Sequence, residues 1–299
     1  MLSDEILNNY LTAGRIASEV RSQASSIVTS GKPVIEICES VESLIRSRGA
    51  IPAFPCNVSV NEVAAHYSSP PGDQFTIPPD SLVKVDLGVS VNGYIADTAT
   101  TVCLNTEYEG MVLAVEKALS QAIKTIRPNI KTTQVGKAIQ QTITQYGFKP
   151  IWNLSGHQMR RYILHTGKSI PNVARFTVSK IQEDEVYAIE PFCTFSHGSG
   201  EVRGTREAYI FRLQRTKRTK NTKVRRLQEF IQQKFRSLPF SQRWFTEFEL
   251  DGWLPVFNEL LRNRSITGYP PLVERQNQIV AQAEHTVIVT EDGCLVTTL

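Results

Sequence analysis

The sequence predicts a mixed α+β fold made of two similar halves, and two observations carry this prediction. Amphipathic helix patterns come in two pairs, over 4–45 and 111–143, and stretches with strand character follow each pair. After each pair, the chain runs from a glycine through an apolar residue, proline and an aromatic residue to asparagine, over 49–57 and again over 147–153. Recurrence of one order about a hundred residues apart indicates an internal duplication.

The first half begins with two helices. Residues 4–29 carry an apolar stripe at helical spacing before Ser30-Gly31, and a second stripe over 34–45 stops at Gly49. A glycine just past the last periodic residue is the usual stop signal of a helix. Extended segments are predicted to follow over 57–65, 82–91 and 94–104.

The second half repeats the helix pair and then changes character. Helical stripes over 111–123 and 135–143 end at Gly147. Eight Lys/Arg and no acidic residue lie between Arg212 and Arg226, and 227–261 is aromatic-rich with a helical pattern. We interpret 205–265 as a helical insertion entered through a solvated basic loop, which leaves 1–204 and 266–299 as the main domain. Strands are predicted again over 279–283 and 286–289, with a turn at 291–293.

Composition excludes several classes of protein. The 299 residues contain no apolar run of about 18, so a membrane-spanning helix is not expected. The N-terminus lacks the basic and apolar regions of a secretory signal. Five scattered cysteines form no CxxC pair, which argues against a disulfide framework or structural zinc site. These features predict a cytoplasmic protein, and a net charge of +4 is too mild to imply nucleic-acid binding by the whole surface.

The most informative local feature is a hairpin at Asn92-Gly93, which separates two β-rich runs. With these two residues as the turn, Asp97 lies opposite Gly88, and Asp86 shares the same face. The two carboxylates are then diagonal neighbours, about 7–8 Å apart at Cα. Two readings follow: solvated aspartates on an exposed face, or carboxylates that bind two divalent cations.

Three further residues add to this pair. His157 is one of five histidines, and Glu190 and Glu284 lie beside apolar strand-like runs, where an unpaired acid is costly. Four carboxylates and one imidazole could balance two divalent cations and leave room for a bridging water. Two such metals, about 3.5–4 Å apart, lower the pKa of the water and polarise a carbonyl, which is the equipment for amide hydrolysis.

The order Asp-x10-Asp, His, Glu, Glu resembles the metal set of the methionine aminopeptidases, which are pita-bread metallopeptidases. The resemblance covers nearly the whole chain. The insertion resembles the helical subdomain of type 2 enzymes, and the short start resembles the archaeal form. The motifs that carry the resemblance lie at 61–67, 85–88, 97–99, 155–157, 164–168, 188–192, 268–272 and 283–286.

The resemblance implies a pita-bread fold with an internal pseudo-twofold repeat, and a role for each matching residue. Asp86 would bind one metal, and His157 and Glu190 would hold the second. Asp97 would bridge both, or chelate one and touch the other, and Glu284 would bridge. Glu190 would also shuttle the proton of the attacking water. His66 and His165 would not be ligands but would bind the substrate and stabilise its tetrahedral intermediate.

The implied reaction is removal of the initiator methionine from nascent chains with a small second residue. The lining of the methionine pocket would include Phe54, Leu164, Ile170 and Tyr269. The cofactors would be two divalent cations, and the ligand set accepts Co, Mn, Fe, Zn or Ni. We expect a monomer, and the basic segment 212–226 could dock on the ribosome through phosphate contacts.

Alternatives remain open. Prolidases and X-Pro aminopeptidases share the metal set but carry a large additional N-terminal domain, and only 85 residues precede Asp86 here. A non-catalytic homologue that binds RNA or ribosomes should lack ligands that this chain keeps. Cys193 is interpreted as a core cysteine, although a nearby metal could make it sensitive to oxidation. His197 has no assigned role, and His285 should face away from Glu284 and be structural.

Overall fold

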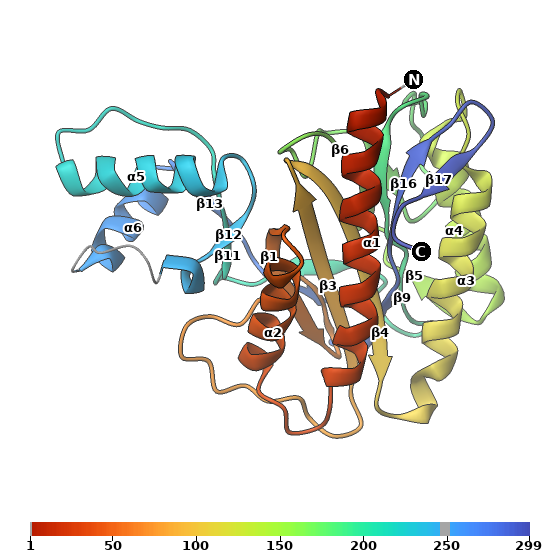
Figure 1. Cartoon of the computed structure of the whole chain (residues 1–299). Coiled ribbons are helices and arrows are strands. Elements are labelled where there is room, and N and C mark those ends of the chain that lie inside the picture. Colours follow the sequence, from red (N-terminus) through yellow and green to blue (C-terminus); the bar gives the residue numbers. More distant parts are fainter. Residues whose placement is uncertain (1, 246–251) are drawn as a thin grey trace.

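The computed structural model describes residues 2–245 and 252–299 (Figure 1). In the first half, two helices cover one face of an antiparallel sheet with strand order β1-β3-β4. Helix and strand bounds agree with the sequence pattern except at 57–65, where the predicted single strand is broken by a turn at Asn61, whose φ is 50°. The elements are α1 (Asp4–Ile27), α2 (Val34–Ser47), β1 (Ile51–Val60), β2 (Val63–Ala65), β3 (Leu82–Val91) and β4 (Tyr94–Cys103).

The β3–β4 hairpin has the register that the Asn92-Gly93 turn predicts. Val91 pairs with Tyr94 and Gly88 pairs with Asp97, without an irregularity along the ladder. Both turn residues have positive φ, 52° and 89°, as a two-residue turn of type I′ requires. The prediction that Asp86 and Asp97 share one face is therefore confirmed.

The second half places another helix pair against a second group of strands. Helices α3 and α4 share an apolar core with the strands of the second half. The 5-stranded sheet has the order β17-β16-β8-β6-β7, and a 3-stranded sheet has the order β15-β9-β5. The elements are η1 (Thr106–Tyr108), α3 (Glu109–Thr125), α4 (Thr132–Gln145), β5 (Phe148–Pro150), β6 (Ser155–Met159), β7 (Ser169–Pro171), β8 (Val186–Ile189), β9 (Phe192–Phe195), β15 (Val280–Gln282), β16 (His285–Val289) and β17 (Cys294–Val296).

The repeated glycines behave alike in the two halves. Gly49 after α2 has φ +77° and Gly147 after α4 has φ +83°, and each precedes a strand that packs on its own helix. A residue with a Cβ is strained in this region of φ, so glycine is the natural helix stop here. The shared local geometry explains why the sequence pattern recurs.

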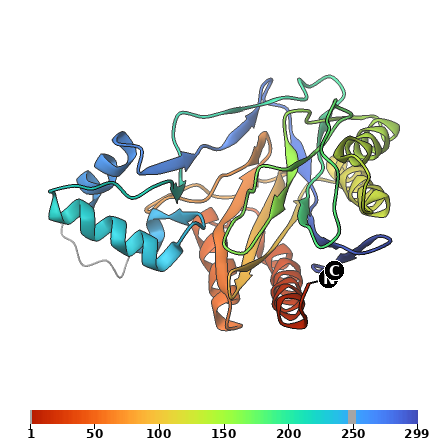
Figure 2. The ribbon, with the colours of Figure 1, turned by 90° about the horizontal axis from the view of Figure 1, so that it is seen from above.

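The chain between 205 and 269 forms a separate cluster of elements with its own apolar core. Figures 1 and 2 show α5 and α6 at one end of the molecule and α3 and α4 at the other. Its strands form the sheet β12-β11-β13, and the flanking strands β10 (Val202–Gly204) and β14 (Leu272–Glu274) form the sheet β10-β14-β2 with β2 of the first half. The elements within the cluster are β11 (Ile210–Leu213), α5 (Thr222–Phe235), β12 (Phe240–Ser241), η2 (Gln242–Phe245), α6 (Trp253–Arg262) and β13 (Ile266–Tyr269).

Two sequence-based interpretations of this region need correction. The basic run is not one solvated loop: Arg212 lies in β11 with its guanidinium over the Tyr269 ring, and the run continues into α5. Helix α5 starts at Thr222, five residues before the predicted helical run, because the Asn221 side chain accepts hydrogen bonds from the first turn. The run 227–261 is two helices with a short strand and a 3-10 turn, and 246–251 lies outside the described residues.

The insertion is attached to the first half by a buried ion pair. Arg243 donates two hydrogen bonds to the Glu42 carboxylate on α2, at 2.8 and 3.1 Å, and both side chains are almost fully buried. The Trp244 indole N–H donates to the same carboxylate. No helix in the described part of the chain is both long and apolar enough to cross a membrane.

Candidate metal centre

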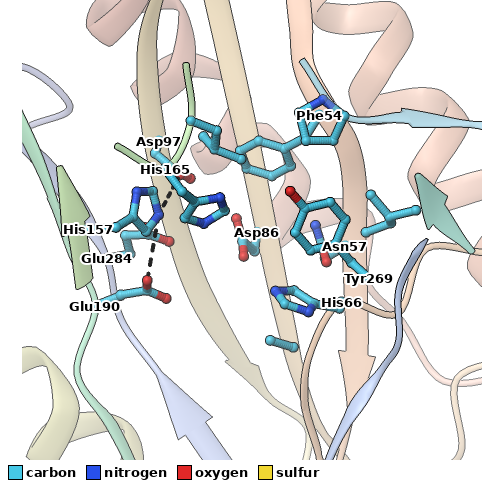
Figure 3. Close-up of a pocket in the computed structure, with 14 residues that line it drawn as sticks. Phe54, Asn57, His66, Asp86, Asp97, His157, His165, Glu190, Tyr269 and Glu284 are labelled. Carbon is cyan, nitrogen blue, oxygen red and sulfur yellow. Dashed lines mark ion pairs between the residues drawn. The ribbon is translucent and has the colours of Figure 1, made fainter. Parts of the chain in front are cut away.

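One cavity collects the five predicted metal ligands and both predicted catalytic histidines (Figure 3). The acidic groups lie toward one side with His157 and His165, whereas His66 lies with Asn57 and Tyr269 toward the apolar side. The lining residues are Phe54, Asn57, Ala65, His66, Asp86, Asp97, His157, Leu164, His165, Glu190, Ile210, Pro239, Tyr269 and Glu284.

Strands from both halves bring the ligand side chains together. The β3–β4 hairpin supplies Asp86 and Asp97. His157 in β6 pairs with Ala188 of β8, so Glu190, two residues further on, points to the same side of that sheet. Glu284 lies just before β16 and pairs with the first half through an isolated bridge to Ala99.

The contact between β4 and the strands of the second half uses threonine hydroxyls. Thr286 Oγ1 accepts from the Asp97 N–H at 2.7 Å and donates to the Asp97 carbonyl at 2.8 Å. The Thr98 hydroxyl donates to the Glu284 carbonyl at 2.8 Å, and Thr101 bonds both backbone groups of Gln282. We call Thr98, Thr101 and Thr286 the threonine seam, because they fix the backbone of two predicted ligands.

The ligand atoms lie close to one another. His157 Nε2 lies 3.6 Å from Asp97 Oδ2 and 3.7 Å from Glu190 Oε1 (Figure 3). Asp97, His157 and Glu284 each offer an atom within 4.8 Å of the others, the one such group in the described residues. Asp86 and Glu190 fall outside that tight group but line the same cavity.

Burial perturbs the acid–base behaviour of the cluster. It raises the pKa of Asp86 to about 7 and that of Asp97 well above its usual range, and neighbouring carboxylates raise the pKa of Asp97 further. Burial, and then charges nearby, likewise raise the pKa values of Glu190 and Glu284. Burial lowers the pKa of His157, so its imidazole is neutral and able to ligate. Four buried carboxylates cannot all ionise unless positive charge is added.

The donor set fits divalent cations. Asp86 Oδ1 and Asp97 Oδ1 are buried and have no hydrogen-bond partner, and Asn57 Oδ1 beside them is in the same state. A buried acceptor without a donor is destabilising, and an oxygen-binding cation would satisfy it. Carboxylates with one imidazole suit first-row divalent metals.

The two remaining histidines of the cavity are neutral and lie beside the ligands. Burial lowers the pKa of His66 and of His165 to about 4. The His165 ring centroid lies 4.2 Å from that of His157, and both His66 and His165 contact the Tyr269 ring. His66 adopts φ 67°, an uncommon conformation that turns its side chain out of the strand direction, and its Nδ1 has no partner.

Three of the four predicted pocket residues line the apolar side of the cavity: Phe54, Leu164 and Tyr269. The Phe54 ring packs against Gly88, where an added Cβ would overlap the ring. Ile170 does not line the cavity. Ile170 lies in β7 and pairs with Gly156 of β6, one position away from the pair His157 and Ser169, so it faces the buried core of the second half and not the predicted ligands.

Four further residues line the cavity that the sequence did not single out: Asn57, Ala65, Ile210 and Pro239. Asn57 pairs with Asp86, but β1 contains two register irregularities that no sequence pattern announced. Ile210 and Pro239 come from the insertion, and only the tertiary fold brings them to the cavity. Asn57 could have been noticed as a polar residue in an apolar strand.

Three other candidates lie away from the cavity. Cys193 is buried in the second core, and burial raises the pKa of its thiol, so it is a core cysteine. His197 stacks on Phe195 and contacts Gln278. His285 faces away from the cavity, as predicted, toward Arg21 and Thr298.

Comparison with known proteins also points to a metallopeptidase. The model of metallopeptidase family M24 matches residues 8–291. A methionine aminopeptidase of Methanothermobacter thermautotrophicus is 44% identical over 98% of this chain and 99% of its own length. Those of Methanocaldococcus jannaschii and Saccharolobus solfataricus are 44% and 40% identical over 96% and 99% of this chain, and 97% and 99% of their own.

Solved structures share the fold. A thermophilic Arx1 matches with a TM-score of 0.83 at 18% identity, over 99% of this chain and 91% of its own. The methionine aminopeptidase of Rickettsia prowazekii matches with a TM-score of 0.72 at 19% identity, over 100% and 99%. The prolidase of Pyrococcus furiosus gives a TM-score of 0.62 at 19% identity, and the match covers 99% of this chain but 64% of the prolidase.

Proposed function

The chain belongs to metallopeptidase family M24, and on that premise we propose that it removes the initiator methionine from the N-termini of nascent proteins. It is a metallo-aminopeptidase, a hydrolase of the first peptide bond. The observation that carries the proposal is the meeting of four carboxyl groups, three imidazoles and an apolar wall in one buried cavity.

We propose that Asp86, Asp97, His157, Glu190 and Glu284 hold two divalent cations. Four carboxylates would neutralise the charge of two such ions, and the raised carboxyl pKa values mark a site that lacks positive charge by itself. When bound, such a pair of cations makes water more acidic and polarises a carbonyl. The donor set accepts Co, Mn, Fe, Zn or Ni and does not select among them.

The side chains of the cavity supply proton transfer and orientation. Glu190 lies at the edge of the cluster, 3.7 Å from His157, where one carboxylate oxygen can accept the proton of the attacking water and return it to the leaving amine. The free α-amine of the substrate would bind a cation or meet Asp97. A chain interior has no such amine, so cleavage is restricted to the N-terminus.

The neutral histidines act as hydrogen-bond donors. With a pKa of about 4, His66 and His165 carry one ring N–H at pH 7 and remain uncharged. His66 would donate to the developing oxyanion, and His165 to the carbonyl of the substrate. Crowding of these rings near the ligands favours a small second residue.

The methionine side chain would occupy the apolar side of the cavity, between Phe54, Leu164, Ile210 and Tyr269. An unbranched thioether fits such a wall without an unsatisfied polar group. Larger side chains are rejected by overlap, whereas loss of one methylene costs only about 1–3 kcal/mol.

We further propose that the enzyme is a type 2 form of the short archaeal kind. An insertion with its own core between β10 and β14, and the similarity to proteins of methanogens and other archaea over nearly their full lengths, support this. The proposed domains are 1–204 with 266–299, and 205–265. A prolidase or X-Pro aminopeptidase is disfavoured, because methionine aminopeptidases are 40–44% identical to this chain, whereas the matched prolidase is 19% identical.

The basic segment 212–226 supports a second, separate proposal: docking on ribosomal RNA. Six of its cationic side chains are exposed, at 215, 218, 220, 223, 225 and 226. Clustered cations bind phosphate backbones with strong salt dependence.

We propose a monomer that works in the cytoplasm, where nascent chains emerge.

The deciding experiment measures metal content and turnover on the same protein. Metal-free protein, reconstituted with Mn²⁺ or Co²⁺, should release methionine from a Met-Ala-Ser peptide, and chelation should abolish this release. We expect two cations per chain at full activity. Inactive metal-loaded protein with tight RNA binding would instead favour a non-catalytic ribosome-binding homologue.

A further inference from the structure

Arg21 on α1 lies behind the metal centre, on the outer side of the threonine seam. Its Nη1 donates to Thr98 Oγ1 at 2.5 Å and to the Thr298 carbonyl at 2.8 Å, with a longer contact of 3.2 Å to His285 Nδ1. No carboxylate in the described residues forms an ion pair with Arg21, and burial lowers the pKa of its guanidinium. Its interactions are therefore hydrogen bonds to groups that hold the metal-bearing strands.

The contact with Thr98 leads to Glu284. An arginine only donates, so Thr98 Oγ1 must accept from it and direct its own hydrogen to another acceptor. That acceptor is the Glu284 carbonyl, at 2.8 Å. Arg21 thus fixes the direction of the hydroxyl that joins β4 to the backbone of a predicted ligand.

The contact with Thr298 leads to Asp97. Thr298 Oγ1 accepts from the Thr286 N–H at 3.1 Å, and the Thr297 N–H donates to the Thr286 carbonyl at 2.9 Å. Thr286 in turn bonds both backbone groups of Asp97. Residues 297–298 are themselves buried against α1 at Gly14, where a Cβ would overlap the Thr297 backbone.

We propose that Arg21 is a positioning residue for the metal centre, acting on Glu284 through Thr98 and on Asp97 through Thr298 and Thr286. Contacts of one guanidinium nitrogen then support the backbone of both residues that are predicted to bridge the two cations. The inference rests on the proposed metal site. Loss of a partner that orients a metal ligand from behind typically weakens metal affinity by about 10–100-fold.

The test compares Co²⁺ binding by wild type, Arg21→Met, Arg21→Lys and Thr98→Val, by calorimetry and by the visible absorption of bound cobalt. Arg15→Met is the matched control, because Arg15 lies on the same helix but is exposed and pairs with Glu19. We expect Arg21→Met to weaken cobalt binding about tenfold or more and to change the absorption bands. Arg21→Lys should lose less cobalt affinity than Arg21→Met. The control Arg15→Met should bind cobalt as wild type does.

Coupling gives the sharper readout. The double variant Arg21→Met, Thr98→Val should lose less affinity than the sum of the single losses, because both act on the same hydroxyl. Additive losses, or a cobalt affinity and spectrum of Arg21→Met equal to those of Arg15→Met, would overturn the inference. Wild type that binds no cobalt would instead refute the metal centre itself. Should Arg21→Met not fold, Arg21→Lys and Thr98→Val carry the same comparison.

Discussion

The two sides of the cavity are built differently. The acidic side comes from paired strands, where hairpin register places Asp86 and Asp97 and threonine hydroxyls fix the backbone of Asp97 and Glu284. The apolar side comes from the irregular strand β1, from loops and from the insertion, which contributes Ile210 and Pro239. The charged groups are thus held by regular strand pairing. The surface proposed to select the substrate side chain is built from the irregular strand, loops and insertion around them.

The largest expected effect breaks the acidic side. Asp97→Asn should lose cations and reduce peptide turnover at least about 10,000-fold, more than ~5 kcal/mol. The metal-free variant should melt at a higher temperature than metal-free wild type at pH 8, because removal of one carboxylate relieves repulsion in a buried cluster. Metal analysis, peptide assay and thermal unfolding check both parts. Full turnover by the variant would refute the ligand assignment.

A second change tests how the insertion is attached. Arg243→Met leaves the Glu42 carboxylate buried without its cation and should lower the free energy of unfolding by about 3–5 kcal/mol. Arg46→Met is the control, since Arg46 lies 3.8 Å from the same carboxylate but is half exposed, and about 0–1 kcal/mol is expected. Chemical denaturation measures both. Equal losses would show that burial of the pair contributes nothing.

A third change sharpens the comparison by altering the apolar side alone. Ile210→Ala should raise KM for a methionyl peptide about tenfold through lost apolar contact, within the 1–3 kcal/mol range of small pocket changes. Metal affinity should stay at the wild-type value, because Ile210 lies in the sheet β12-β11-β13, which carries none of the predicted ligands. A drop in cobalt affinity in calorimetry would mean that the two sides are coupled.

The smallest effect concerns protons at the acidic side. With a pKa of about 7, the Asp86 carboxyl of the metal-free protein is partly protonated at neutral pH, so binding of a cation releases protons. Affinity should fall as the pH drops below 7. Because the folded pKa is raised above 3.8, the contribution of Asp86 to metal-free stability is present below that value and lost as pH rises through 7. Calorimetry in two buffers of different ionisation enthalpy measures the released protons, and buffer-independent heats would contradict this.

Much of the acidic side could be predicted from the sequence. Asn92-Gly93 sets a register, and that register places Asp86 and Asp97 on one face before any coordinates are known. His157, Glu190 and Glu284 stand out by chemistry and join the hairpin pair by charge balance, and the resemblance to a family then implies a role for each. Their convergence depends on contacts between the halves that leave no local signal.

The apolar side could be predicted less well. The β1 irregularities decide that Asn57 meets Asp86, and nothing in the sequence marks where an extra residue is accommodated. Ile170 was wrongly placed in the pocket, since its strand is too short for its facing to be read from alternation. The start of α5 could have been predicted from Asn221, a typical N-cap residue directly before Thr222. The aromatic-rich pattern that begins at 227 drew the predicted start too far along the chain.

The connection at η1 divides the proposed ligands between the halves, with Asp86 and Asp97 before it and His157, Glu190 and Glu284 after it. Neither piece of a chain severed there would possess a complete set of donors. Retention of a cation would therefore require the two fragments to reassociate. Cation binding by a mixture of the fragments would then report that reassociation.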